Sequence, residues 1–227
     1  MKFSNKAFTL AEIVIALAVV GIVAVLATFN ANKDTDEATK IALLRSTYNI
    51  LDAAYKQASL GSDDISTILG DMKDYLQISK NCGTGIGCFQ NDVILKSPAL
   101  ANTSNIHPSL TSNSKLDSVT ADVAYKLILK NGASILVSKT NKYVYVDVNG
   151  PKKGNSVTGD DVFYFVADAE KGLYPYGYDC TFSKTAPGCP YQGEYCTAWA
   201  ILMGNMDYLR CPEKLSWTDK SKTTCNQ

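Results

Sequence analysis

The sequence lacks most of the residues and motifs on which enzyme chemistry usually depends. Its 227 residues include one histidine, His107, which falls in a Ser-, Thr- and Asn-rich stretch expected to be a surface loop. There is no nucleophile elbow, phosphate-binding loop, dinucleotide fingerprint or zinc signature, and no two cysteines are spaced as CxxC. Nothing in the sequence places His107 beside a cysteine to form a nucleophile pair. These absences argue against an enzyme and against a zinc site.

An excess of charge of either sign is also missing. The chain has 22 Lys and Arg residues and 22 Asp and Glu residues, so its formal net charge is zero. A nucleic-acid partner is therefore not indicated, because nucleic-acid-binding domains usually carry a basic excess.

Charge is almost absent from Phe8–Phe29, which is apolar except for Thr9, Glu12 and Thr28. As a helix this stretch would be about 33 Å long, enough to cross a hydrocarbon core of about 30 Å. Lys2 and Lys6 precede it and no acidic residue does. The stretch is therefore predicted to span a membrane once, with the remaining chain exported.

Glu12 is the exception within this span. A carboxylate near the bilayer centre costs about 2.5–3.5 kcal/mol, and less toward an interface. No Lys, Arg or His lies between Lys6 and Lys33 to pair with it. If the chain were cut before Phe8, the new amine could reach Glu12 of a neighbouring copy in a stack of identical helices.

Two simpler interpretations of this stretch explain less. A secretory signal peptide has an apolar core of about 7–15 residues, and Val25–Ala27 could serve as its cleavage site. The run is longer than that and contains Glu12. An ordinary single-pass anchor fits the length but gives no reason for Glu12.

The residues Ala7–Glu12, reading AFTLAE after a short basic leader, resemble the class III signal of type IV pilins and type II secretion pseudopilins. The resemblance implies that a prepilin peptidase cuts between Ala7 and Phe8 and methylates the amine of Phe8. It also implies that Glu12 guides subunit docking. The family usually has Gly before the cut, where this chain has Ala7.

The same resemblance implies partners and a location. The partners would be the prepilin peptidase, other pilin or pseudopilin subunits, an inner-membrane assembly platform and membrane lipid. The chain would lie in the inner membrane with its head outside the cytoplasm, and then in a pilus or pseudopilus. A minor pilin or a membrane-anchored binding module, for DNA uptake or capture of a surface ligand, is the alternative.

The expected organisation is a leader over residues 1–7, a long helix over 8–60 with its membrane half at 8–29, and an extracytoplasmic head over 61–227. No proline interrupts the helix, and Gly61 is a suitable stop. Its second half carries an apolar stripe that should pack on the head: Ile41, Leu44, Tyr48, Leu51, Tyr55 and Ala58.

Four strands are predicted in the head, over 123–129, 133–137, 142–148 and 162–166, with an Asn-Gly turn at 131–132. Their short connections favour an antiparallel meander. A short helix is expected within 62–77, loops over 81–88 and 102–118, and burial of Trp199, Ile201, Leu202 and Met203. The predicted fold class is α+β and pilin-like: a long N-terminal helix on an antiparallel β-meander with a Cys-rich C-terminal lobe.

Seven cysteines lie beyond the apolar run, which is typical of an oxidising compartment: Cys82, Cys88, Cys180, Cys189, Cys196, Cys211 and Cys225. Three bonds and one remaining thiol can be drawn in about 105 ways. The intervening glycines favour Cys82–Cys88. A Cys211–Cys225 bond resembles the C-terminal disulfide loop of many pilins, which leaves Cys180, Cys189 and Cys196 to compete for the third bond.

Hard oxygen donors gather between the last two predicted strands, at Asp147, Asn149, Asp160 and Asp161. Such donors suit Ca²⁺, and the segment resembles the calcium loop of some major pseudopilins. The alternative is a turn-rich loop in which these side chains cap backbone N–H groups. Calcium is the one cofactor that the sequence suggests.

Overall fold

The computed structural model describes residues 36–89, 116–152, 157–185, 188–191 and 193–226. The chain divides into two units, Met1–Thr39 and Lys40–Gln227, and the fold described below is that of the second unit. The predicted span Phe8–Phe29 lies outside the described residues. Within the described part of the chain, no helix is both long enough and apolar enough to cross a bilayer.

A helix covers residues 36–58, the described part of the predicted helix 8–60, and the rest of that helix stays a prediction. It ends two residues before the predicted Leu60, because the N–H groups of Leu60 and Gly61 bond three residues back and tighten the last turn. The predicted apolar stripe is confirmed, since five of its six side chains are buried and Tyr48 is half-buried.

A six-stranded antiparallel sheet forms the centre of the head, with the strands in sequence order. The strands are β1 (Ile78–Gly83), β2 (Val123–Leu129), β3 (Ser134–Ser138), β4 (Tyr143–Asp147), β5 (Val162–Asp168) and β6 (Gly172–Pro175). The predicted meander is confirmed, and β2 has the bounds that the sequence predicts. The two outer strands, β1 and β6, were not expected, and β1 includes Asn81–Gly83, which we predicted as loop.

The turn between β2 and β3 forms at the predicted Asn-Gly pair. Gly132 has a φ of 95°, which an L side chain rarely adopts. Two hydrogen bonds close the turn: the N–H of Leu129 donates to the carbonyl of Ala133, and the N–H of Gly132 donates to the carbonyl of Leu129. This turn sets the register of β2 against β3.

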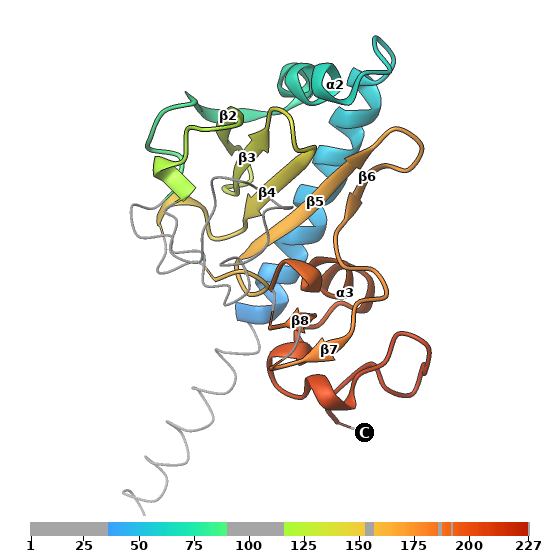
Figure 1. The fold of residues 1–227 in the computed structure, drawn as a ribbon. Coiled ribbons are helices and arrows are strands. Elements are labelled where there is room, and N and C mark those ends of the chain that lie inside the picture. The colour runs from blue at the N-terminus through green and yellow to red at the C-terminus, as the bar shows by residue number, and fades with distance from the viewer. Residues whose placement is uncertain (1–35, 90–115, 153–156, 186–187, 192, 227) are drawn as a thin grey trace, which may run out of the picture. The chain divides into compact units, whose positions relative to one another are not determined.

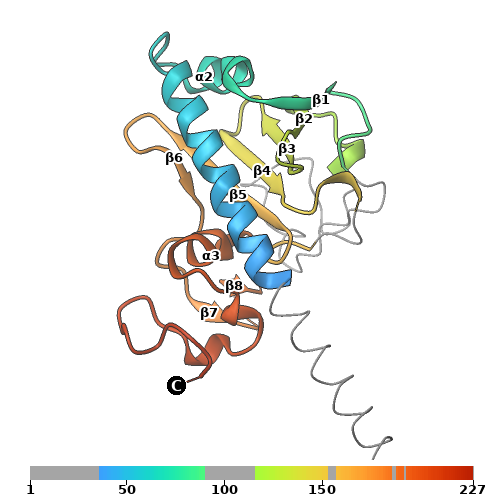
Figure 2. The same ribbon diagram turned by 180° about the vertical axis from the view of Figure 1, so that it is seen from behind.

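Helix 36–58 runs along one face of the sheet from Lys40 onward, as Figures 1 and 2 show from opposite sides. The ring of Tyr48 stacks on Phe165 of β5 at 5.3 Å between centroids. The hydroxyl of Tyr55 donates to the carbonyl of Asp168. Residues on the same strands alternate between faces, so Tyr145 and Tyr164 point to the other side, where Phe89 and Leu116 join them.

Short helices connect helix 36–58 to the sheet and some of the strands to one another. The helix expected within 62–77 is present as α2 (Ile65–Asp71) followed by the 3₁₀ turn η1 (Met72–Tyr75). The carboxylate of Asp64 accepts the N–H of Thr67 at 2.8 Å and thereby caps α2. Two further 3₁₀ turns, η2 (Leu116–Ser118) and η3 (Gly150–Lys152), lie in connections of the sheet.

The C-terminal lobe combines a small parallel pair of strands with short helices. Its elements are β7 (Phe182–Ser183), β8 (Cys189–Pro190), η4 (Gly193–Cys196), α3 (Thr197–Met203), η5 (Asp207–Leu209) and η6 (Pro212–Lys214). Trp199 and Ile201 of α3 are buried as predicted, and Met203 is half-buried, but Leu202 is 51% exposed and that prediction is wrong. The buried residues of α3 are its first five, Thr197–Ile201, so Leu202 is exposed because it lies beyond them, at the C-terminal end of the helix.

The lobe is also fastened to the long helix. The guanidinium of Arg45 donates two hydrogen bonds, of 2.8 and 2.6 Å, to the carbonyl of Ile201. This carbonyl lies in the last turn of α3, where backbone oxygens need an outside partner and a cation is favoured.

Candidate functional site

The residues predicted to carry processing and docking lie outside the described residues. These are Ala7 and Phe8 at the cut, Phe8 as the methylated residue and Glu12 as the docking carboxylate. His107 also lies outside them. The roles of these residues stay predictions, and the structure bears on the head alone.

The acidic loop between β4 and β5 brings part of the predicted oxygen cluster together. The N–H of Asn149 donates to the Oδ1 of Asp147 at 3.0 Å, and its side-chain amide donates to the Oδ1 of Asp161 at 2.6 Å. Asn149 therefore connects the end of β4 to the residue before β5. The first of these bonds is the turn-capping contact that the alternative interpretation predicts.

An ammonium group from the long helix reaches the same cluster, which the sequence did not indicate. The Nζ of Lys40 lies 2.9 Å from the Oδ1 of Asp160 and 2.8 Å from the Oδ1 of Asp161. The Lys40 side chain is 13% exposed and that of Asp161 only 5%. The helix and the loop are thus joined by a partly buried triad of one cation and two anions.

The pKa shifts in this triad follow from its geometry. Burial by itself lowers the pKa of Lys40, but the hydrogen bonds to Asp161 and Asp160 outweigh burial and raise that pKa above its ordinary value. Burial raises the pKa of Asp161, and the neighbouring charge of Asp160 adds to the rise. The ammonium of Lys40 therefore stays charged, whereas its single positive charge does not fully offset the cost of burying the negative charge of Asp161.

Among the residues that the structure describes, no three His, Cys, Asp or Glu side chains group in a way that could hold a metal ion. The calcium hypothesis for Asp147, Asn149, Asp160 and Asp161 stays a prediction. It now has to account for Lys40, whose charge already offsets the carboxylates that Ca²⁺ would need.

Three disulfides staple the head: Cys82–Cys88, Cys189–Cys196 and Cys211–Cys225. Their half-cystines are 6, 7 and 14 residues apart, so each bond closes a short loop. The first is the bond that the loop spacing favours, and the third is the bond that the pilin resemblance implies. Cys180 remains a half-buried thiol, and burial raises its pKa.

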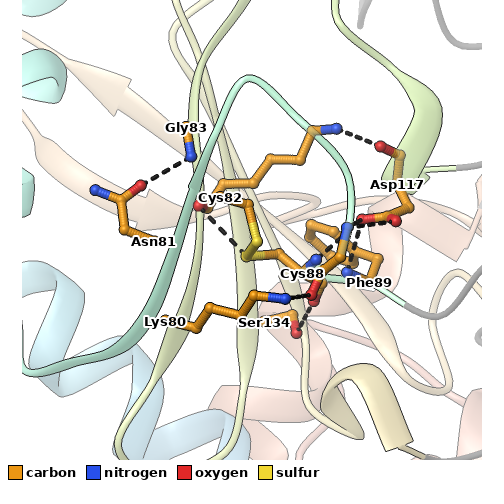
Figure 3. The surroundings of a disulfide bond; sticks show 10 residues. Lys80, Asn81, Cys82, Gly83, Cys88, Phe89, Asp117 and Ser134 are labelled. Atoms are coloured by element: carbon orange, nitrogen blue, oxygen red, sulfur yellow. Dashed lines mark hydrogen bonds between the residues drawn. A yellow bond between two sulfur atoms is a disulfide. The ribbon is translucent and has the colours of Figure 1, made fainter.

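The backbone on the C-terminal side of the first disulfide is held by Asp117 of η2 (Figure 3). Its carboxylate accepts the N–H of Gly87 at 2.7 Å, of Cys88 at 3.0 Å and of Phe89 at 2.9 Å. Asp117 itself is 2% exposed. We predicted residues 102–118 as a surface loop, which is wrong for Leu116 and Asp117, because both are buried.

A buried lysine supports Asp117 from β2. The Nζ of Lys126, a residue with no exposed surface, donates to the backbone carbonyl of Asp117. Burial lowers the pKa of Lys126. Ser134 of β3 donates its hydroxyl to the carbonyl of Cys88. The sequence gives one indication of this cluster, which is that Lys126 is a charged residue within the otherwise apolar β2.

Comparison with known families bears on the N-terminus. Residues 2–28 match the family model described as "Prokaryotic N-terminal methylation motif". No curated protein and no solved structure shows significant similarity to the chain. The matched range contains Lys2–Ala7 of the predicted leader, Phe8 and Glu12. The chain therefore carries the N-terminal methylation signal of type IV pilins and pseudopilins.

Proposed function

We propose that this chain is a structural subunit that is processed by a prepilin peptidase and assembles into a type IV pilus or a type II secretion pseudopilus. The match of residues 2–28 to the methylation motif carries the proposal. The head supports it, because a long helix from Lys40 onward docks its apolar stripe on an antiparallel meander. A subunit of a filament needs such a rigid connection between its helix and its head.

The proposed steps assign roles to the N-terminal residues. The peptidase cuts between Ala7 and Phe8 at the cytoplasmic face, and methylates the new amine. The mature helix stays in the inner membrane, with the head outside the cytoplasm, until an assembly platform adds it to a growing filament. The amine of Phe8 and the carboxylate of Glu12 neutralise each other during docking, while apolar faces supply the adhesion.

The disulfides fit the proposed location. Thiols are kept reduced in the cytoplasm, whereas three bonds in one head are typical of an exported protein. The proposed subunit has a structural role, and we assign it no catalytic residue.

Polymer analysis tests the proposal. In the native cell, an epitope-tagged chain should be processed and should appear in sheared or crosslinked filaments. A major subunit would dominate the filament fraction, and a minor pilin would be present in trace amounts. An Ala7→Leu variant, with a bulky residue at the cut, should insert into the membrane uncut and be missing from filaments. A processed chain that stays wholly monomeric in the membrane would contradict the proposal and favour the binding module.

A further inference from the structure

The Cys82–Cys88 loop is fixed by contacts that do not involve its sulfur atoms. The carboxylate of Asp117 accepts three consecutive N–H groups, those of Gly87, Cys88 and Phe89. Figure 3 shows these bonds converging on one side chain next to the disulfide. A carboxylate that accepts several N–H groups makes charge-assisted bonds, which are stronger than bonds between neutral groups.

The other side of Cys88 is anchored as well. Its carbonyl accepts the hydroxyl of Ser134, and the Nζ of Lys80 donates to the carbonyl of Gly87 at 2.8 Å. Lys126 in turn holds the backbone of Asp117 in place. The position of Cys88 on the sheet is therefore set by hydrogen bonds from β1, β2, β3 and η2 together.

The C-terminal disulfide shows a similar arrangement. The Oδ2 of Asp207 accepts the N–H of Cys225 at 2.7 Å, and its backbone carbonyl accepts the N–H of Cys211 at 2.8 Å. Arg210 forms an ion pair with the same carboxylate. A buried aspartate thus lies beside a half-cystine at two separate places in the head.

We propose that Asp117 is a positioning residue for disulfide formation, which orders Gly87–Phe89 in the reduced chain so that Cys88 faces Cys82 before the bond exists. Cys82 is half-buried, whereas Cys88 has no exposed surface. Cys82 therefore reacts first with an external disulfide such as oxidised glutathione, and releases one thiol. The thiolate of Cys88 then displaces the second thiol, so that the external disulfide takes up the two electrons.

Such positioning has a clear use in this chain. Six of the seven cysteines pair after export, and Cys180 is a competing thiol. A loop that is ordered before oxidation raises the effective concentration of Cys88 at Cys82 relative to every other cysteine. Correct pairing then does not depend on later reshuffling of wrong bonds.

Oxidative refolding of Asp117→Asn tests the proposal. Asparagine keeps the shape but offers one neutral oxygen, and its amide group is a donor that faces N–H groups. The full chain, in detergent, is reduced, unfolded and refolded with oxidised and reduced glutathione. Samples are then alkylated and mapped without reduction. We expect Cys82–Cys88 to form about tenfold more slowly than in the original chain, with more Cys82 or Cys88 bonded to Cys180.

Asp64→Asn is the matched control. Asp64 also accepts a backbone N–H, but it caps α2 and is remote from any half-cystine in sequence. Asparagine is as good a cap as aspartate, so pairing should be unchanged. If Asp117→Asn lowers only the stability of the oxidised protein and leaves the rate and partners of pairing unchanged, the residue is merely structural and the proposal is wrong.

Amide exchange of a Cys82→Ser/Cys88→Ser variant provides a second test. We expect the N–H groups of Gly87–Phe89 to stay protected without the disulfide, and to lose protection when Asp117→Asn is added. Exchange as fast as in an unstructured peptide in the double serine variant would overturn the proposal. If that variant does not fold, the refolding measurement decides alone.

Discussion

Replacing Lys40 by methionine should destabilise the head by about 1–3 kcal/mol at pH 7. The change keeps the apolar stem and removes the ammonium that lies 2.9 Å from Asp160 and 2.8 Å from Asp161. Breaking a fully buried ion pair costs about 3–5 kcal/mol, because an uncompensated charge remains. The expected value is lower here, since the Asp160 side chain is 35% exposed and water screens it.

The pH dependence of this deficit has a definite sign. The pKa of Lys40 is raised in the folded state, so its contribution is fully present below its unfolded value of 10.5 and is lost only at higher pH. The pKa of Asp161 is raised by burial, and loss of Lys40 raises it further. The folded variant then binds a proton more readily than its unfolded state does. The deficit should therefore be largest near pH 7 and should shrink as Asp161 becomes protonated toward pH 4.

Urea unfolding of the full chain in detergent, followed by the fluorescence of the buried Trp199, measures the deficit. Lys56→Met is the matched control on the same helix. Lys56 pairs with Asp52 at 2.7 Å, but its side chain is 68% exposed, so water screens the pair and its loss should leave the free energy of unfolding almost unchanged. The reasoning is refuted if Lys40→Met is no more harmful than Lys56→Met, or if its deficit grows on acidification.

Three further results are expected. Leu51→Ala, at a fully buried position of the stripe, should lower the free energy of unfolding by about 2–5 kcal/mol, and an effect below 1 kcal/mol would mean that the helix is not docked as described. The intact mass of the membrane form should equal that of the chain without its first 7 of 227 residues and with one methyl group added to Phe8. A mature chain that starts at Thr28 would instead favour a secretory signal peptide. The calcium hypothesis predicts a lower melting temperature in chelator than in calcium, and equal values would leave the turn-capping alternative, in which Lys40 offsets Asp160 and Asp161.

Local patterns predicted the centre of the head well. The apolar stripe from Ile41 to Ala58 and the apolar, partly β-branched run of β2 each indicate a buried segment, and both patterns depend only on residues that are close in the sequence. The bond between Cys82 and Cys88 was predictable for a similar reason, because a short glycine-rich loop closes with little strain. The membrane span and Glu12 lie outside the described residues and stay predictions.

Contacts between distant parts of the chain were not predictable in this way. Strand β1 reads ISKNCG and is mostly exposed, so only its pairing with β2 makes it a strand. Lys40 and Asp160 are 120 residues apart, and Asp117 is 30 residues from Gly87. A single aspartate in a polar stretch carries no sign that it will be buried among N–H groups.

The assembly of Glu12→Leu tests the central claim most directly. Leucine removes the charge penalty in the membrane, so insertion should be at least as efficient as in the original chain. We expect normal abundance in the membrane fraction, an intact head and a strong loss of crosslinked filament or pseudopilus. Thr28→Leu, which also replaces a polar residue of the apolar run, should assemble normally. Normal assembly of Glu12→Leu would contradict the docking role and leave this chain as a membrane-anchored domain.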